Sequence, residues 1–166
     1  MDWLPLASAA LGGLIGAGST LTADRIRWRR DITERAAERQ RAEQAQQRTT
    51  RHEIYAEYLT ALSRLRNGLR ESAHDSTTLP ADKAAQIQAV FLESGAYELR
   101  FRIQLVAPAA VVQHTEGAYK SLRRLRMAIE DGASFEDIEY LERRDHYHDQ
   151  LTQLKEALRN DLGITP

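Results

Sequence analysis

The stretch that decides the fold of this 166-residue chain reads Ile54-Tyr-Ala-Glu-Tyr-Leu-Thr-Ala-Leu-Ser-Arg-Leu-Arg-Asn-Gly-Leu69. Its large apolar residues recur every three or four positions, which is the spacing of one face of an α-helix. These residues are Ile54, Tyr55, Tyr58, Leu59, Leu62, Leu65 and Leu69. Because an apolar helix face must be buried against other elements, the stretch predicts the first helix of a packed all-α domain. Gly68 is the only residue inside it that disfavours a helix.

A second helix is predicted at about Pro80–Val106, after a loop at His74–Pro80 that carries capping residues and a proline. Its expected apolar stripe consists of Ile87, Val90, Phe91, Tyr97, Phe101 and Leu105. The segment Arg100–Val106 alternates like a strand. A single short strand would have no partner in this chain, so the helix is the better interpretation.

Two further helices complete the predicted domain. The third begins near Pro108 and ends at Asp131-Gly132, with an inner face of Val111, Val112, Thr115, Ala118, Tyr119, Leu122, Leu125 and Ile129. Ser134 and Asp137 form a variant capping box for the fourth, which Gly163 ends. Its expected inner face is Phe135, Ile138, Leu141, Leu151, Leu154 and Leu158. Four amphipathic helices with short connections predict an antiparallel four-helix bundle over residues 54–166.

Upstream of the bundle, residues 24–53 are rich in Arg, Glu, Gln and Ala, and they contain almost no large apolar residue after Ile32. These are strong helix formers, so the segment predicts a charged helical stalk about 45 Å long. Such a helix is a solvated spacer or one strand of a loose assembly. A tight coiled coil is not expected, because no heptad of apolar residues is sustained.

The N-terminal segment Trp3–Ala23 carries no formal charge. Twenty-one residues without charge are enough for a helix to cross a bilayer core of about 30 Å, so residues 1–23 are predicted to be a transmembrane anchor. A cleaved secretory signal would need a positively charged N-terminal region, yet the only charged side chain before the run is that of Asp2. A buried soluble helix would be shorter or carry a polar face, and a helix lying in the interface would need polar residues along one side.

A basic collar follows the predicted anchor and sets its orientation. The collar is Arg25, Arg27, Arg29 and Arg30, and Trp3 and Trp28 flank the membrane interfaces. Positive residues stay on the cytoplasmic side, so we expect a single-pass protein of the inner (plasma) membrane whose C-terminal domain faces the cytoplasm. The absence of cysteine is compatible with that reducing compartment.

Charge is unevenly distributed along the chain. Residues 25–73 carry 12 arginines against 7 acidic residues, whereas residues 74–166 carry 11 basic and 15 acidic residues. A positive segment next to the anchor favours an anionic inner leaflet as its partner. The modest excess, with acids interspersed, argues against a nucleic-acid partner.

Small residues form a stripe inside the predicted anchor. Gly12 and Gly16 make a G-x-x-x-G pair, and Ala9, Gly13 and Ala17 repeat the spacing one position on. Small residues four apart allow two helix backbones to approach closely in lipid. The pair therefore predicts a homo-oligomer through the membrane helix, although glycine is common in membrane helices in any case.

One cluster has the composition of a metal site, Asp145-His146-Tyr147-His148-Asp149. On a helix, Asp145, His148 and Asp149 share a face, whereas His146 points elsewhere. A metal would need further ligands from other helices, such as His52, His114 or Glu116. A solvated patch is the favoured interpretation, and neither a metal nor a cofactor is expected.

Two other groups have simple structural interpretations. Tyr55, Tyr58, Tyr97 and Tyr119 lie on the apolar stripes and are expected in the core. Arg123, Arg124 and Arg126 would suit a phosphate or an acidic partner, but around one helix they splay apart and predict a solvated face. The chain has no cysteine nucleophile, G-x-S-x-G, phosphate loop or H-E-x-x-H, so it is not expected to be an enzyme.

The layout resembles small membrane-anchored proteins of actinobacteria. The features that carry the resemblance are the Gly/Ala-rich N-terminal span, the Arg/Glu/Gln-rich helix and the segment His52-Glu-Ile-Tyr-Ala-Glu-Tyr-Leu-Thr-Ala-Leu62. The KilB-type proteins of conjugative plasmids are similar in this way. The resemblance implies a role in plasmid transfer or spread, and it brings no catalytic residues.

The sequence therefore predicts a non-enzymatic interaction or scaffold protein that positions an unidentified cytoplasmic protein partner at the inner membrane. The alternative is a holin-type or Kil-type protein that perturbs the membrane by assembling through the Gly12–Gly16 face. In that alternative, the first thirty residues alone would be toxic.

Overall fold

The computed structural model describes the backbone of residues 4–75 and 77–164, and their side chains except those of residues 4–27, 29–33, 80 and 81. This part of the chain contains helices and no strand. The helices are α1 Leu4–His74, α2 Pro80–Glu93, α3 Ala96–Val106, α4 Ala109–Glu130 and α5 Ile138–Leu162. The chain divides into two compact units, Met1–Gln47 and Arg48–Pro166.

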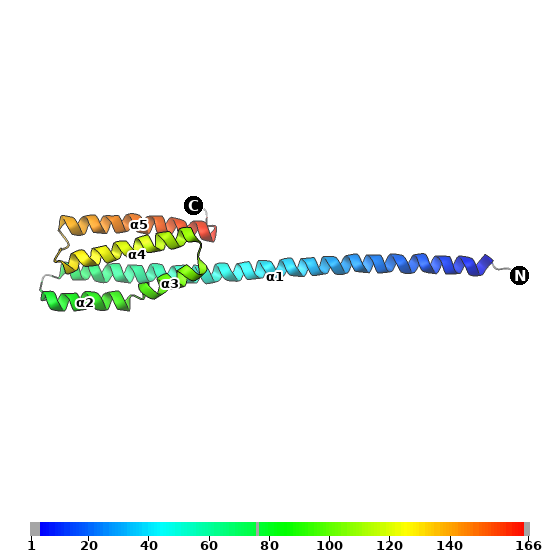
Figure 1. Ribbon diagram of the computed structural model, residues 1–166, viewed down its shortest axis with the longest axis horizontal. Helices are drawn as coiled ribbons and strands as arrows, with labels where there is room; N and C mark the ends of the chain where they lie inside the picture. The colour runs from blue at the N-terminus through cyan, green and yellow to red at the C-terminus, as the bar shows by residue number, and fades with distance from the viewer. Residues whose placement is uncertain (1–3, 76, 165–166) are drawn as a thin grey trace. The chain divides into compact units, whose positions relative to one another are not determined.

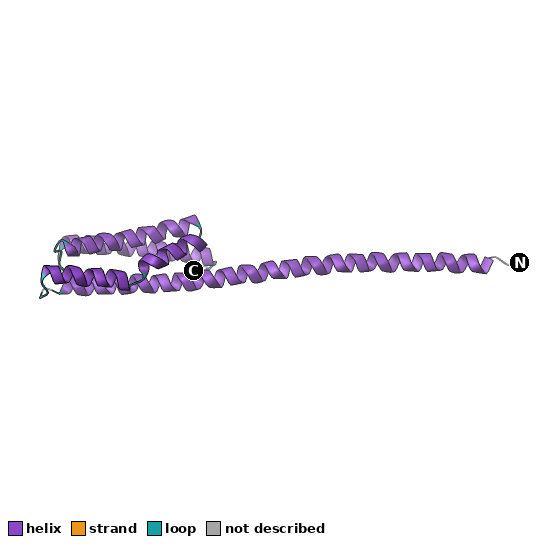
Figure 2. Ribbon diagram, turned by 60° about the horizontal axis from the view of Figure 1, so that its bottom comes forward, coloured by secondary structure: helices purple, strands orange, loops and turns teal. Residues whose placement is uncertain are grey.

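The second unit is a four-helix bundle, which confirms the predicted all-α class. Its four positions are filled by the part of α1 after Gln47, by the consecutive helices α2 and α3, by α4 and by α5 (Figure 1). Short connections at alternate ends make neighbouring positions antiparallel, and the turned view in Figure 2 shows the same arrangement. Helices α4 and α5 lie side by side along most of their length.

The stripe on α1 supplies one wall of the bundle core, as predicted. Tyr58, Leu62, Leu65 and Leu69 are fully buried, and Leu59 is half-buried. The Tyr58 hydroxyl donates a hydrogen bond of 3.1 Å to the carbonyl oxygen of Thr115 on α4. The apolar stripe and this buried hydrogen bond together fix α1 against α4.

Gly68, the apparent helix breaker, is explained by the packing of α1 on α2. A Cβ atom at this position would overlap the side chain of Val90. Glycine costs helix stability relative to alanine by about 1 kcal/mol, but here it lets the two helices approach closely.

The predicted single helix at Pro80–Val106 is wrong in one respect, because it breaks at Ser94–Gly95 into α2 and α3. Gly95 adopts a left-handed conformation with φ of +69°, which a residue inside an α-helix does not have. The break shifts the helical phase, so Ala96 and Ile103 are buried on α3. Tyr97, Phe101 and Leu105, which were expected in the core, are instead 48%, 42% and 85% exposed.

Helix α4 has the predicted extent, whereas α5 begins three residues later than expected. Its N-cap is Asp137, whose carboxylate accepts a 2.6 Å hydrogen bond from the Ser134 backbone N–H. This bond lowers the pKa of Asp137. Ile138 is therefore the first helical residue, 76% exposed rather than in the core as predicted. Gly163 caps the C-terminus at φ +69°, as predicted.

Within the part of the chain whose side chains are described, no helix has an apolar stretch long enough to cross a membrane. The predicted anchor Trp3–Ala23 and its Gly12–Gly16 face lie outside those side chains. The collar residues Arg25, Arg27, Arg29 and Arg30 lie outside them as well, and Trp28 is 67% exposed. The anchor, the collar and the glycine face remain predictions.

Candidate functional site

The predicted metal candidates lie on the outer surface of α5. Asp145, His148 and Asp149 are all exposed. The Asp145 carboxylate accepts hydrogen bonds of 2.7 and 2.9 Å from the neighbouring Arg144. Glu116, one of the further ligands considered, is engaged by Arg100 and Gln104. Among the described residues, no three His, Cys, Asp or Glu side chains gather closely enough to hold a metal ion.

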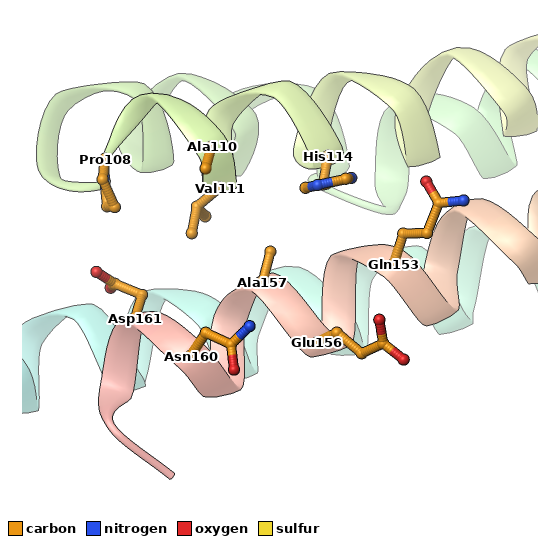
Figure 3. A pocket seen from close by; sticks show the side chains of 9 residues that line it. All are labelled: Pro108, Ala110, Val111, His114, Gln153, Glu156, Ala157, Asn160 and Asp161. Atoms are coloured by element: carbon orange, nitrogen blue, oxygen red, sulfur yellow. The ribbon is translucent and has the colours of Figure 1, made fainter. Parts of the chain in front are cut away.

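A cavity of about 330 Å³ lies between the start of α4 and the end of α5 (Figure 3). Its floor is apolar, with Val111 of α4 facing Ala157 of α5. The His114 ring lies on the α4 side, while the Glu156 side chain points away from α4. Polar groups are therefore present at the cavity, but they do not converge on one point.

The carboxylate of Asp161 at this cavity is used to hold the bundle together. It accepts hydrogen bonds of 2.9 and 3.1 Å from Arg51 and one of 2.8 Å from the Tyr55 hydroxyl, both on α1. Asp161 and Arg51 are largely buried, with 10% and 23% of their side chains exposed. A single Arg51 nitrogen, Nη1, makes both of its contacts, and the Tyr55 hydroxyl adds the third. Hydrogen bonds to a partly buried carboxylate are strong, so the cavity is best understood as part of the joint between α1 and α5.

A second cavity, of about 420 Å³, combines arginines with aromatic rings and forms the strongest candidate site. Helices α2, α3 and α4 all contribute to it. Its lining residues are Phe91, Tyr97, Arg100, Tyr119, Arg123, Arg126, Met127 and Glu130. We call this cavity the arginine–aromatic pocket.

Arg100 is the central cation of the pocket. Its guanidinium carbon lies 4.7 Å from the ring centroids of Phe101 and Tyr119 and 5.0 Å from that of Tyr97. One terminal nitrogen donates a 3.3 Å hydrogen bond to Glu116, whereas the buried Nε atom has no hydrogen-bond partner within the described residues. The side chain is only 15% exposed. Stacking on rings holds a guanidinium in a fixed plane, so this positive charge is preorganised.

Two arginines of α4 complete the positive lining. Arg126 stacks over the Phe91 ring at 4.9 Å and donates a 2.8 Å hydrogen bond to Glu130. Arg123 is exposed and forms no ion pair with any described residue. Burial raises the pKa of Tyr119, and the positive charges of Arg100 and Arg123 act in the opposite direction. Arg100 and Arg123 line the same cavity as this phenol.

The sequence pointed to part of this pocket and missed the rest. Arg123 and Arg126 were identified, but they were expected on a solvated face because arginines along one helix splay apart. Arg124 does splay away and does not line the pocket. Arg100 was not identified, because a continuous helix at residues 80–106 would have given α3 another phase. The Ser94-Gly95 dipeptide was the available signal, since such pairs mark turns.

A second surface feature lies on α3 and shares Tyr97 with the pocket. Tyr97, Phe101 and Leu105 are spaced four residues apart and form an exposed apolar stripe. Glu98 and Arg102 are exposed beside the stripe, and Arg102 pairs with Glu57 of α1 at 2.7 Å. Exposed apolar side chains that occur together, bordered by charged residues, are typical of interaction surfaces.

Comparison of the chain with protein-family models, with curated proteins and with solved structures finds no match.

Proposed function

We propose that this protein is a non-enzymatic interaction protein, anchored in the inner membrane by residues 1–23, that positions a partner protein on the cytoplasmic side. The observation that carries the proposal is the exposed stripe of Tyr97, Phe101 and Leu105 on α3. The bundle buries its other apolar stripes, so a stripe left open is available to a partner.

The geometry of the stripe favours the apolar face of a helix as its occupant. Side chains at i, i+4 and i+8 form a straight row along α3, and such rows pack into the grooves of a second helix. The flanking Glu98 and Arg102 supply charges of both signs, which suit a partner helix whose own apolar face is bordered by charged residues.

The anchoring part of the proposal is supported by the uncharged run Trp3–Ala23 and by the arginines that follow it. If the chain is anchored, a partner that binds α3 is also held close to the membrane surface. The resemblance to KilB-type proteins adds plasmid transfer or spread as the process in which such positioning would serve. The alternative role of the N-terminal segment is assembly through Gly12 and Gly16, as in a membrane-perturbing protein of Kil type.

Partner capture tests this function directly. We expect the full chain, purified from its host with a C-terminal tag after mild crosslinking, to retain a defined protein. The Leu105→Asp variant should lose that protein, because a carboxylate on the stripe cannot be buried without a large desolvation cost.

The matched control is Ile138→Asp, since Ile138 is also exposed, at 76%, but lies at the start of α5. This variant should retain the same protein as the wild type. Equal retention by all three chains would contradict the assignment of the α3 stripe as the docking surface.

A further inference from the structure

We infer that the arginine–aromatic pocket is a binding site for a phosphate monoester carried on an aromatic or apolar body. The site is additional to the proposed partner docking, since the cavity is formed by α2, α3 and α4 and shares only Tyr97 with the exposed stripe of α3. The ligand class follows from the charge, the preorganisation and the shape of the pocket.

The charge of the lining selects an anion. Three arginines line the pocket against one glutamate. Arg126 is paired with Glu130 and Arg100 with Glu116, so Arg123 carries the positive charge that no described ion pair neutralises. Arg100 and Arg126 are also poorly hydrated, because only 15% and 23% of their side chains are exposed. Positive charges in such surroundings bind anions more strongly than fully solvated ones do.

The geometry of the cations favours phosphate over a single carboxylate. A phosphate monoester carries a charge of about −1.5 to −2 near neutral pH and three acceptor oxygens. The stacked guanidiniums of Arg100 and Arg126 lie across ring faces, so their rotation is restricted before any ligand arrives. Arg123 supplies a further positive charge that no described ion pair neutralises. Arginine is the side chain best suited to multidentate phosphate contacts.

The remaining lining residues define the body of the ligand. Tyr97 and Met127 are 48% and 51% exposed and line the same cavity as the arginines. A ring or alkyl chain attached to the phosphate would cover both side chains. The cavity of about 420 Å³ lies within the range of small-molecule sites. Soluble phosphate esters and the headgroup of a lipid such as phosphatidic acid share this chemistry.

Calorimetric titration of phenyl phosphate into the full chain, held in nanodiscs of phosphatidylcholine, tests the site. We expect phenyl phosphate to bind more tightly than inorganic phosphate, because its ring adds contact with Tyr97 and Met127. Arg123→Gln should raise the Kd about tenfold. Since Arg123 is exposed, the variant should keep the wild-type circular dichroism and melting temperature.

Arg124→Gln is the matched control, because Arg124 is the adjacent arginine on the same helix and does not line the pocket. It should leave the Kd unchanged. Glu130→Gln should lower the Kd, since it removes the carboxylate that competes for Arg126. Absence of phenyl phosphate binding, or equal weakening by Arg123→Gln and Arg124→Gln, would overturn the inference.

A second arm identifies the source of the phosphate. The titration is repeated in nanodiscs that contain phosphatidic acid, and again in nanodiscs that contain phosphatidylserine at matched charge. Weaker phenyl phosphate binding with phosphatidic acid alone supports occupation by a lipid headgroup. Unchanged binding in both lipids supports a soluble phosphate ester. Equal weakening in both would assign the effect to membrane charge and contradict occupation of the pocket by a lipid headgroup.

Discussion

Replacing Leu62 with alanine is expected to lower the free energy of unfolding of the Arg48–Pro166 unit by about 2–5 kcal/mol. Leu62 is fully buried in the core cluster, so truncation removes apolar contacts and leaves a cavity. The measurement is urea unfolding of a fragment that begins at Arg48, with circular dichroism used to monitor the loss of helix. The prediction depends on α1 being an integral helix of the bundle.

Leu105→Ala is the matched control, because it makes the same chemical change at a side chain that is 85% exposed. It should change the free energy of unfolding by no more than about 0.5 kcal/mol. If the two variants lost equal stability, the stripe of α1 would not form the wall of the core.

The second large effect is expected at alkaline pH, because the bundle buries several tyrosines. Burial raises the pKa of Tyr147 to about 12, and burial also raises that of Tyr58, with the nearby Glu116 carboxylate adding to the shift. An unfolded tyrosine titrates near pH 10. The neutral phenols therefore stabilise the folded state fully below about pH 10, and that stability is lost as the pH rises toward the folded pKa values.

Each such tyrosine should lower the free energy of unfolding by about 1.4 kcal/mol per pH unit above about pH 10. Tyr58 and Tyr147 together should give about 2.7 kcal/mol per pH unit. Urea midpoints measured from about pH 9 to about pH 12, alongside tyrosinate absorbance, would show the decline. Tyr147→Phe should have a shallower decline than the wild type, whereas identical slopes would show that Tyr147 is not protected in the folded state.

The sequence predicted the core where one helix repeats its apolar residues without interruption. On α1 the stripe from Ile54 to Leu69 is buried as expected, because the period of three or four residues leaves one possible inner face. Gly68 indicated a helix break that does not occur. Its role is steric, because it makes room for the Val90 side chain of α2. Such a contact between helices has no counterpart in local propensity.

Prediction failed where one residue changed the helical phase. The left-handed Gly95 separates α2 from α3 and moves Tyr97, Phe101 and Leu105 to the surface. The exposed stripe and the place of Arg100 in the pocket both follow from this break. In the connection between α4 and α5, the N-cap of α5 is Asp137, which lies later in the chain than the pattern suggested and leaves Ile138 exposed. Both cases turn on backbone geometry at a single residue, which periodicity does not encode.

We propose that the chain holds its helical bundle at the cytoplasmic face of the inner membrane. The most direct test is membrane fractionation of the full chain with a C-terminal reporter, followed by protease accessibility from each side. We expect carbonate-resistant membrane association, with the reporter cleaved only from the cytoplasmic side. A reporter found in the soluble fraction, or cleaved from the outer side of intact cells, would contradict it.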